Sequence, residues 1–193
     1  MNKTVAVLLS IVGVIGLIFL IFWLWAASVH DSAVQYQEQV DKEWNDVQAT
    51  YQRRADLIPN LVNTVKGAAE NEKEILTRVT EARAGIADAK TPGEIESVGR
   101  KINSTIGLVF ERYPQIRSTE NFAQLQSQLE GTENRINVAR QRYNESVSKY
   151  NSYIRGYFKK TALSFTESPD DNFTTREGFQ ADPGSEDAPE VQF

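Results

Sequence analysis

The stretch RRADLIPNLVNTVKG, residues 53–67, decides how the helices of this chain are arranged. It places Pro59 inside a long helical pattern, shortly after the adjacent arginines Arg53 and Arg54. A proline fits the first turn of a helix, where its missing N–H needs no partner, and Asp56 can cap the free backbone donors there. The arginines suit the last turn of a preceding helix, near its negative end. We therefore interpret this stretch as the first hairpin turn between two helices.

Upstream of this turn the chain begins with an apolar segment. Residues 5–27 carry no charge, and at 1.5 Å per residue they can cross a bilayer core of about 30 Å. A cleaved signal peptide is the alternative, but its apolar region has about 7–15 residues, fewer than this run. Trp23 and Trp25 stand at the exit end, where aromatic rings prefer the headgroup level. Residues 1–29 are therefore predicted to be a membrane anchor.

Small residues recur at helical spacing inside this anchor: Ala6, Ser10 and Gly13 form a strip on one face, and Gly16 lies beside it. Such strips allow helices to approach closely in lipid, and the alternative is ordinary filler in a single anchor. The sidedness is encoded weakly, because Lys3 before the span favours a cytoplasmic N-terminus and an external domain.

Residues 30–165 predict a helical domain. Their apolar residues follow a period of 3.5–3.6 and never settle into the period of two that strands require. No glycine or proline occurs from residue 17 to 58, so we expect the anchor to continue into the first soluble helix without a linker. A second helix follows Pro59, and a third is delimited by Thr91-Pro92 and Tyr113-Pro114. The fourth helix has a seam that extends to Phe158.

Short connections between these helices predict an all-α fold, an antiparallel four-helix bundle behind a transmembrane helix. Residues 166–193 differ in composition, since they combine prolines and glycines with eight acidic side chains and one basic residue, Arg176. Such a segment is expected to lack a stable core of its own.

Helix four contains two pairs, Tyr143-Asn144 and Tyr150-Asn151, which are seven residues apart and share one face. One interpretation is structural, because a buried asparagine or tyrosine hydroxyl can set helix register. The other is a polar groove that holds a peptide or a partner helix. The sequence leaves both open.

The residues give no sign of catalysis. There is no cysteine, and His30 at the membrane boundary is the single histidine, so thiolate chemistry and histidine–metal pairs are excluded. No phosphate-binding loop or nucleophile elbow occurs. We predict no catalytic, cofactor-binding or metal-binding residues. The near-neutral body with an acidic end also gives no reason to expect a nucleic-acid partner.

Several motifs, taken together, resemble those of the LemA family. The opening stretch contributes Arg53, Arg54, Asp56, Pro59, Asn60, Lys66 and Gly67, and the fourth helix contributes Asn134, Arg140, Tyr143, Asn144, Tyr150 and Asn151. The ending Pro-x-Val-x-Phe, residues 189–193, also resembles the family. One departure is Gly156-Tyr157-Phe158-Lys159-Lys160, which stands where the family usually has Phe-Pro.

The resemblance implies a single-span protein of the bacterial inner membrane with a four-helix bundle and no established biochemical activity. It implies a bundle in the cytoplasm, opposite to the charge-based expectation, so the side of the soluble domain stays open. A membrane peptidase or a TPM-domain protein is an implied partner. Our leading hypothesis is a membrane-anchored, homo-oligomeric helical scaffold or adaptor, and the second is a sensor or peptide-binding module of the cell envelope.

Overall fold

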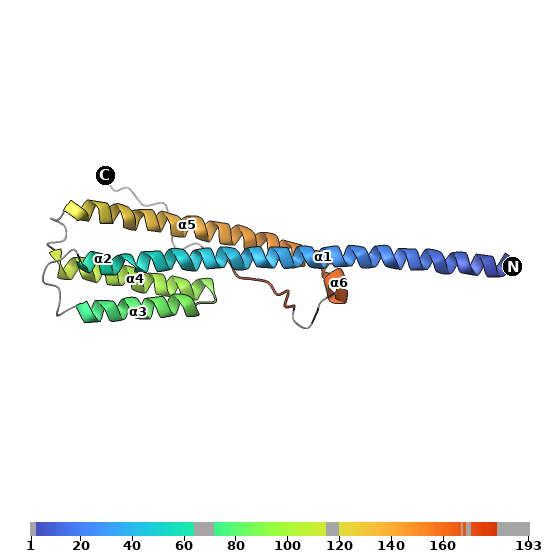
Figure 1. Ribbon diagram of the computed structural model, residues 1–193, viewed down its shortest axis with the longest axis horizontal. Helices are drawn as coiled ribbons and strands as arrows, with labels where there is room; N and C mark the ends of the chain where they lie inside the picture. Colours follow the sequence, from blue (N-terminus) through green and yellow to red (C-terminus); the bar gives the residue numbers. More distant parts are fainter. Residues whose placement is uncertain (1–2, 64–71, 115–119, 167, 169–170, 181–193) are drawn as a thin grey trace, which may run out of the picture. The chain divides into compact units, whose positions relative to one another are not determined.

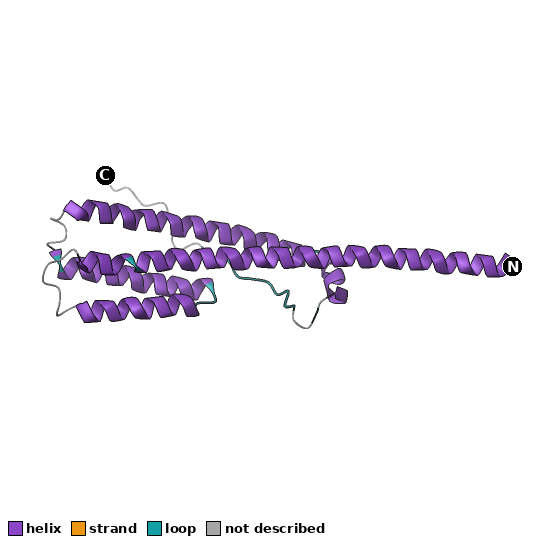
Figure 2. Ribbon diagram, viewed as in Figure 1, coloured by secondary structure: helices purple, strands orange, loops and turns teal. Residues whose placement is uncertain are grey.

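The computed structural model describes residues 3–63, 72–114, 120–166, 168 and 171–180, which contain six helices and no strand (Figures 1 and 2). The all-α prediction is confirmed for this part of the chain. The chain divides into two compact units. One comprises residues 1–41 and 146–176, and the other comprises residues 42–145 and 177–193.

Helix α1, Lys3–Ala55, runs without a break through the apolar segment into the helical domain, as the absence of glycine and proline predicted. Among the described residues it is the one helix long and apolar enough to cross a membrane. Its large apolar side chains from Val5 to Trp25 are all exposed. Exposing this much apolar surface to water would be costly.

The helix break predicted near Pro59 occurs at a single residue, Asp56. Helix α2, Leu57–Asn63, begins directly after it, and Pro59 lies in the first turn of α2 as expected. Asp56 Oδ1 accepts from Nη2 and Nε of Arg83 on α3 at 2.6 and 2.9 Å, so this carboxylate oxygen is directed to α3. The chain reverses between Asp56 and α3, since residues 48–56 meet residues 83–89 in antiparallel order (Figure 1).

Helix α3 spans Glu72–Asp88 and α4 spans Pro92–Arg112. Thr91 caps α4 by accepting from the Glu94 N–H, while the Glu94 carboxylate accepts from the Thr91 N–H, so both halves of a capping box are present. Helix α4 ends at Tyr113-Pro114 as predicted. Here the local sequence signals agree with the structure at both ends.

Helix α5, Glu120–Ile154, is shorter than its apolar seam suggested. A turn at Arg155 and Gly156 ends it, and a separate helix, α6, spans Tyr157–Thr166. Phe158, which the sequence placed on the seam of the fourth helix, is 74% exposed. The prediction was wrong at this point, because the heptad spacing continues through a residue pair where the backbone turns.

The second unit, residues 42–145 and 177–193, contains the four-helix bundle. Apolar side chains from all its helices are buried, among them Val47, Tyr51, Ile58, Leu61, Ile75, Val79, Ile95, Ile102, Val109, Ile136 and Tyr143. Gln48 of α1 donates to the carbonyls of Ile86 and Ala89 at 2.9 and 3.1 Å, which satisfies acceptors at the end of α3. Arg112 of α4 pairs with Glu74 of α3 at 2.8 Å.

The first unit, residues 1–41 and 146–176, is built around Tyr153 of α5. Its ring lies 4.9 Å from the ring of Tyr36, and its hydroxyl donates to the Val29 carbonyl at 3.2 Å. The Lys159 ammonium of α6 lies 3.8 Å from the centre of the same Tyr153 ring. These contacts join α1, the end of α5 and the start of α6.

Candidate functional site

The two asparagines of the Tyr-Asn pairs hold residues 171–180, an extended segment without helix or strand. Asn144 donates through Nδ2 to the Phe179 carbonyl at 3.0 Å and accepts through Oδ1 from the Phe179 N–H at 2.7 Å. Asn151 makes the same pair of bonds with Arg176, at 2.8 and 2.9 Å. Each amide therefore satisfies both main-chain groups of one residue, as a neighbouring β-strand would.

Phe179 is the apolar anchor of this segment and is 8% exposed. Its ring stacks on Trp44 of α1 at 6.3 Å and meets the edge of Tyr143 at 5.5 Å. The Arg140 guanidinium lies 4.7 Å from the ring centre. Two aromatic rings and a cation thus surround one phenyl ring, an arrangement that favours an aromatic ligand. We call Trp44, Arg140, Tyr143 and Asn144 the Phe179 site.

The residues before Phe179 are held by their backbone. The Tyr143 hydroxyl donates to the Glu177 carbonyl at 3.1 Å. A Cβ atom added at Gly178 would lie 2.9 Å from Asn144 Oδ1, closer than real Cβ contacts. The Phe179 site therefore accepts an extended segment in which glycine precedes the aromatic residue.

Ion pairs behind the Phe179 site fix its arginine. Arg140 pairs with Glu96 of α4, and Arg54 of α1 pairs with Glu133 of α5. Burial lowers the pKa of Arg54 and raises the pKa of Tyr51, which packs beside both pairs. Arg140 is thus held between a carboxylate and the phenyl ring that it faces.

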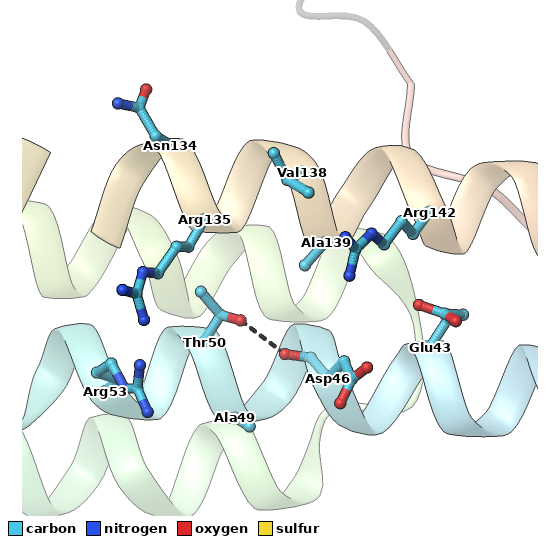
Figure 3. A pocket seen from close by; sticks show the side chains of 10 residues that line it. All are labelled: Glu43, Asp46, Ala49, Thr50, Arg53, Asn134, Arg135, Val138, Ala139 and Arg142. Carbon is cyan, nitrogen blue, oxygen red and sulfur yellow. Dashed lines mark hydrogen bonds between the residues drawn. The ribbon is translucent and has the colours of Figure 1, made fainter. Parts of the chain in front are cut away.

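A groove of about 500 Å³ lies between α1 and α5 in the second unit (Figure 3). It is lined by Glu43, Asp46, Ala49, Thr50, Arg53, Asn134, Arg135, Val138, Ala139 and Arg142. Figure 3 shows the Arg53 and Arg135 side chains directed toward one another. In the described residues neither forms an ion pair with an acidic side chain. We call this the arginine groove, because three of its lining residues are arginines, whose guanidiniums suit carboxylate groups.

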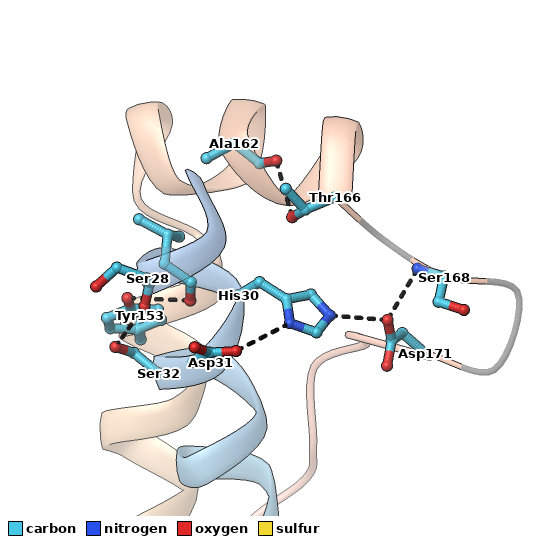
Figure 4. Close-up of polar contacts among 10 residues, drawn as sticks. Ser28, His30, Asp31, Ser32, Tyr153, Ala162, Thr166, Ser168 and Asp171 are labelled. Atoms are coloured by element: carbon cyan, nitrogen blue, oxygen red, sulfur yellow. Dashed lines mark hydrogen bonds and ion pairs between the residues drawn. The ribbon is translucent and has the colours of Figure 1, made fainter. Parts of the chain in front are cut away.

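In the first unit, His30 of α1 contacts the same 171–180 segment (Figure 4). Its Nε2 lies 2.9 Å from Asp171 Oδ2, its Nδ1 lies 3.7 Å from Asp31, and the Phe173 ring meets it edge-on at 5.6 Å. The hydrogen bond to Asp171 raises the pKa of His30, and the bond from His30 lowers the pKa of Asp171. The His30 side chain is therefore paired with the Asp171 carboxylate of the 171–180 segment.

The other residues predicted from sequence are dispersed. Ser10, Gly13, Gly16, Trp23 and Trp25 lie exposed along α1, which also carries Ala6. Asn60 is exposed on α2, and Tyr150 is fully buried in α5. Lys66, Gly67 and the ending at residues 189–193 lie outside the described residues.

Sequence reasoning missed one member of the Phe179 site, Trp44, and the two residues that the site holds, Gly178 and Phe179. In the sequence, Trp44 is one of several apolar residues that follow the helical period of the first soluble helix, and nothing distinguishes it from the others. The signal for the other two was a glycine–phenylalanine pair in an acidic segment otherwise poor in apolar residues. That pair is isolated, so no periodicity marks it.

Comparisons with known proteins agree with the motifs. A sequence model described as the LemA family matches residues 43–193. "Protein LemA" of Metamycoplasma hominis is 22% identical over 138 residues, which cover 69% of this chain and 63% of that protein. The chain thus matches less than two thirds of that relative's length.

Proposed function

This chain belongs to the LemA family, and we propose that it acts as a membrane-anchored adaptor whose α5 face binds extended peptide segments. The observation that carries this proposal is the pair of hydrogen bonds from Asn144 to the main chain of Phe179. A structural asparagine that only set helix register would be expected to bond within the bundle. This one bonds to an irregular segment far along the sequence.

Main-chain recognition allows the face to accept more than one sequence, and the Phe179 site supplies selectivity. Burying a phenyl ring is worth about 1.5–3 kcal/mol, or about 10–100-fold in affinity. The favoured partner segment is therefore extended, with glycine followed by phenylalanine.

Residues 176–179 of the chain occupy this face themselves. A tethered segment competes at an effective concentration of about millimolar. A partner of similar affinity must therefore be present at a higher local concentration, or it must bind when the tethered segment is released. The tethered segment thus limits binding to partners that are abundant or concentrated at the membrane.

The test removes the tethered occupant and supplies the segment in trans. The full-length chain carrying Gly178→Ala and Phe179→Ala, in lipid nanodiscs, is titrated with a fluorescent peptide of residues 173–180, FTTREGFQ. We expect saturable binding. The affinity should fall about tenfold or more when the peptide carries alanine in place of Phe179. Wild-type protein should bind the peptide more weakly, because its own segment competes.

The matched control is Asn134→Ala, an exposed asparagine on the same helix that does not contact the segment. Binding should survive Asn134→Ala and be lost with Asn144→Ala. If the emptied face binds neither peptide, or if both asparagine variants behave alike, the face is a structural latch and the adaptor proposal is wrong.

Self-association would add a second function to the anchor, and the open small-residue face of α1 favours it. A Cβ atom added at Gly13 or Gly16 meets nothing within 4 Å, so this face is available to another helix. We propose a homo-oligomer in the bacterial inner membrane that recruits membrane partners, such as a membrane peptidase or a TPM-domain protein.

A further inference from the structure

We propose that α6 is a second membrane contact: a short helix that lies in the lipid headgroup region where α1 leaves the bilayer. All the residues involved belong to the first unit, and α6 can make this contact on either side of the membrane. It is also independent of the peptide-binding face, which involves other residues.

The first observation is the exposure of aromatic side chains on a ten-residue helix. Tyr157 is 81% exposed, Phe158 is 74% exposed and Phe165 is 66% exposed. Single exposed apolar residues are common in soluble proteins, but three large aromatic residues within ten positions form a patch. Such a patch calls for an apolar environment.

The second observation is where this patch lies. The Phe165 ring meets the Phe22 ring of α1 edge-on at 6.2 Å, and Phe22 also lies 5.8 Å from Trp25. Phe22 belongs to the exposed apolar stretch of α1, whereas Ala26, one turn later, is completely buried. The aromatic patch of α6 therefore continues the surface of α1 that requires lipid, at the end where that surface stops.

The third observation is the distribution of residues around α6. Ala162 and Leu163 are buried, which fixes the inner face. Phe158 and Phe165 are seven residues apart and share one side, while Lys160 and Ser164 lie on the other. An aromatic side and a cationic, polar side along one short helix are typical of helices that lie flat in the membrane interface.

Lysine placement supports the same conclusion. Lys159 is directed back to the Tyr153 ring at 3.8 Å, within the protein. Lys160 is exposed and can reach lipid phosphates while its methylene stem covers apolar surface. A lipid surface satisfies the phenyl rings and the ammonium at once, and it is already required by α1, so we assign the patch to lipid.

The absence of cysteine from the sequence allows a clean test by single labelling. Full-length variants Phe158→Cys, Phe165→Cys and Ser164→Cys carry an environment-sensitive NBD label in vesicles of mixed zwitterionic and anionic lipid. Leu20→Cys on α1 serves as the lipid-exposed reference, and Ser164→Cys is the matched control on the same helix. Shallow spin-labelled lipids and aqueous iodide are the two quenchers.

We expect the labels at residues 158 and 165 to be quenched by the shallow lipid probe and shielded from iodide, at a depth of about 5–10 Å in the interface. The label at residue 164 should show the reverse. Equal iodide quenching at residues 158, 164 and 165 would overturn the proposal. So would a water-exposed label at residue 20, because the premise that α1 enters the bilayer would then be wrong.

Discussion

Gly99 of α4 and Gly131 of α5 both lie inside helices, but an added methyl group would meet different surroundings. At Gly99 it would lie 2.6 Å from a ring carbon of the buried Tyr51, whereas at Gly131 it meets nothing within 4 Å. Overpacking a core costs about 1–3 kcal/mol, and glycine to alanine in a helix gains about 1 kcal/mol. Gly99→Ala should therefore lower the free energy of unfolding and Gly131→Ala should raise it.

Thermal unfolding of both variants in the same detergent checks this pair. About 1 kcal/mol corresponds to about 2–4 °C in Tm for a chain of this size. If Gly99→Ala unfolds at a higher temperature than wild type, the close packing of Tyr51 on α4 is wrong. A loss of stability in Gly131→Ala would mean that α5 is covered at this position.

The contact between His30 and Asp171 predicts a pH-dependent attachment of the 171–180 segment. The pKa of His30 is raised above 6.5, so its stabilisation is fully present below pH 6.5 and is lost as the pH rises through the raised value. The pKa of Asp171 is lowered below 3.8, so its share is present above pH 3.8 and is lost on further acidification. Attachment should be strongest between these limits.

A spin label at the exposed Thr174→Cys measures this attachment. Label mobility should increase as the pH rises from 6.5 through the raised pKa of His30. His30→Gln, which can donate a hydrogen bond but carries no charge, should remove that dependence. Asp31 also faces the His30 ring, at 3.7 Å, so Asp31→Asn is needed to separate its share. A pH response that persists in His30→Gln would refute the assignment to this pair.

At the scale of elements, α4 shows what local sequence can specify. Thr91 and Glu94 form a capping box at the start of α4, and backbone N–H groups lower the pKa of Glu94, chiefly that of Lys90. Loss of such a cap costs about 1 kcal/mol, so Thr91→Ala should lower the free energy of unfolding by this amount. Thr80→Ala, at an exposed position of α3, is the control. It should change the free energy of unfolding little, because the Thr80 hydroxyl donates to the Leu76 carbonyl of its own helix. Chemical denaturation compares the two, and equal losses would contradict a specific role for the cap.

The ends of α5 and the position of Phe179 show where local sequence fails. The apolar spacing that predicts α5 continues to Phe158, and nothing in that spacing marks the turn at Arg155 and Gly156. Phe179 has no periodic neighbours, and its partners Trp44 and Tyr143 are distant in sequence. The Tyr-Asn repeat indicated a polar face, but only the fold shows which segment lies on it.

At the scale of the whole chain, the proposed membrane attachment and the proposed partner binding use different surfaces. The proposed membrane surface consists of the exposed apolar stretch of α1 and the exposed aromatic side chains of α6, where Phe165 meets Phe22. The Phe179 site uses residues of the helical bundle alone. Variants in one surface should therefore leave the other intact: Phe158→Ser with Phe165→Ser should not alter peptide binding by the emptied face.

The last prediction concerns self-association through α1. Multi-angle light scattering of the full-length chain in detergent should give the mass of an oligomer, and Gly13→Leu with Gly16→Leu should reduce it to a monomer. Both positions have open space around them, so leucine disturbs a neighbouring helix without straining its own chain. Leu8→Phe with Ile15→Phe adds bulk to the opposite side of α1 and should keep the oligomer. A wild-type monomer would remove self-association, and equal masses for the two double variants would place the contact elsewhere than the small-residue strip.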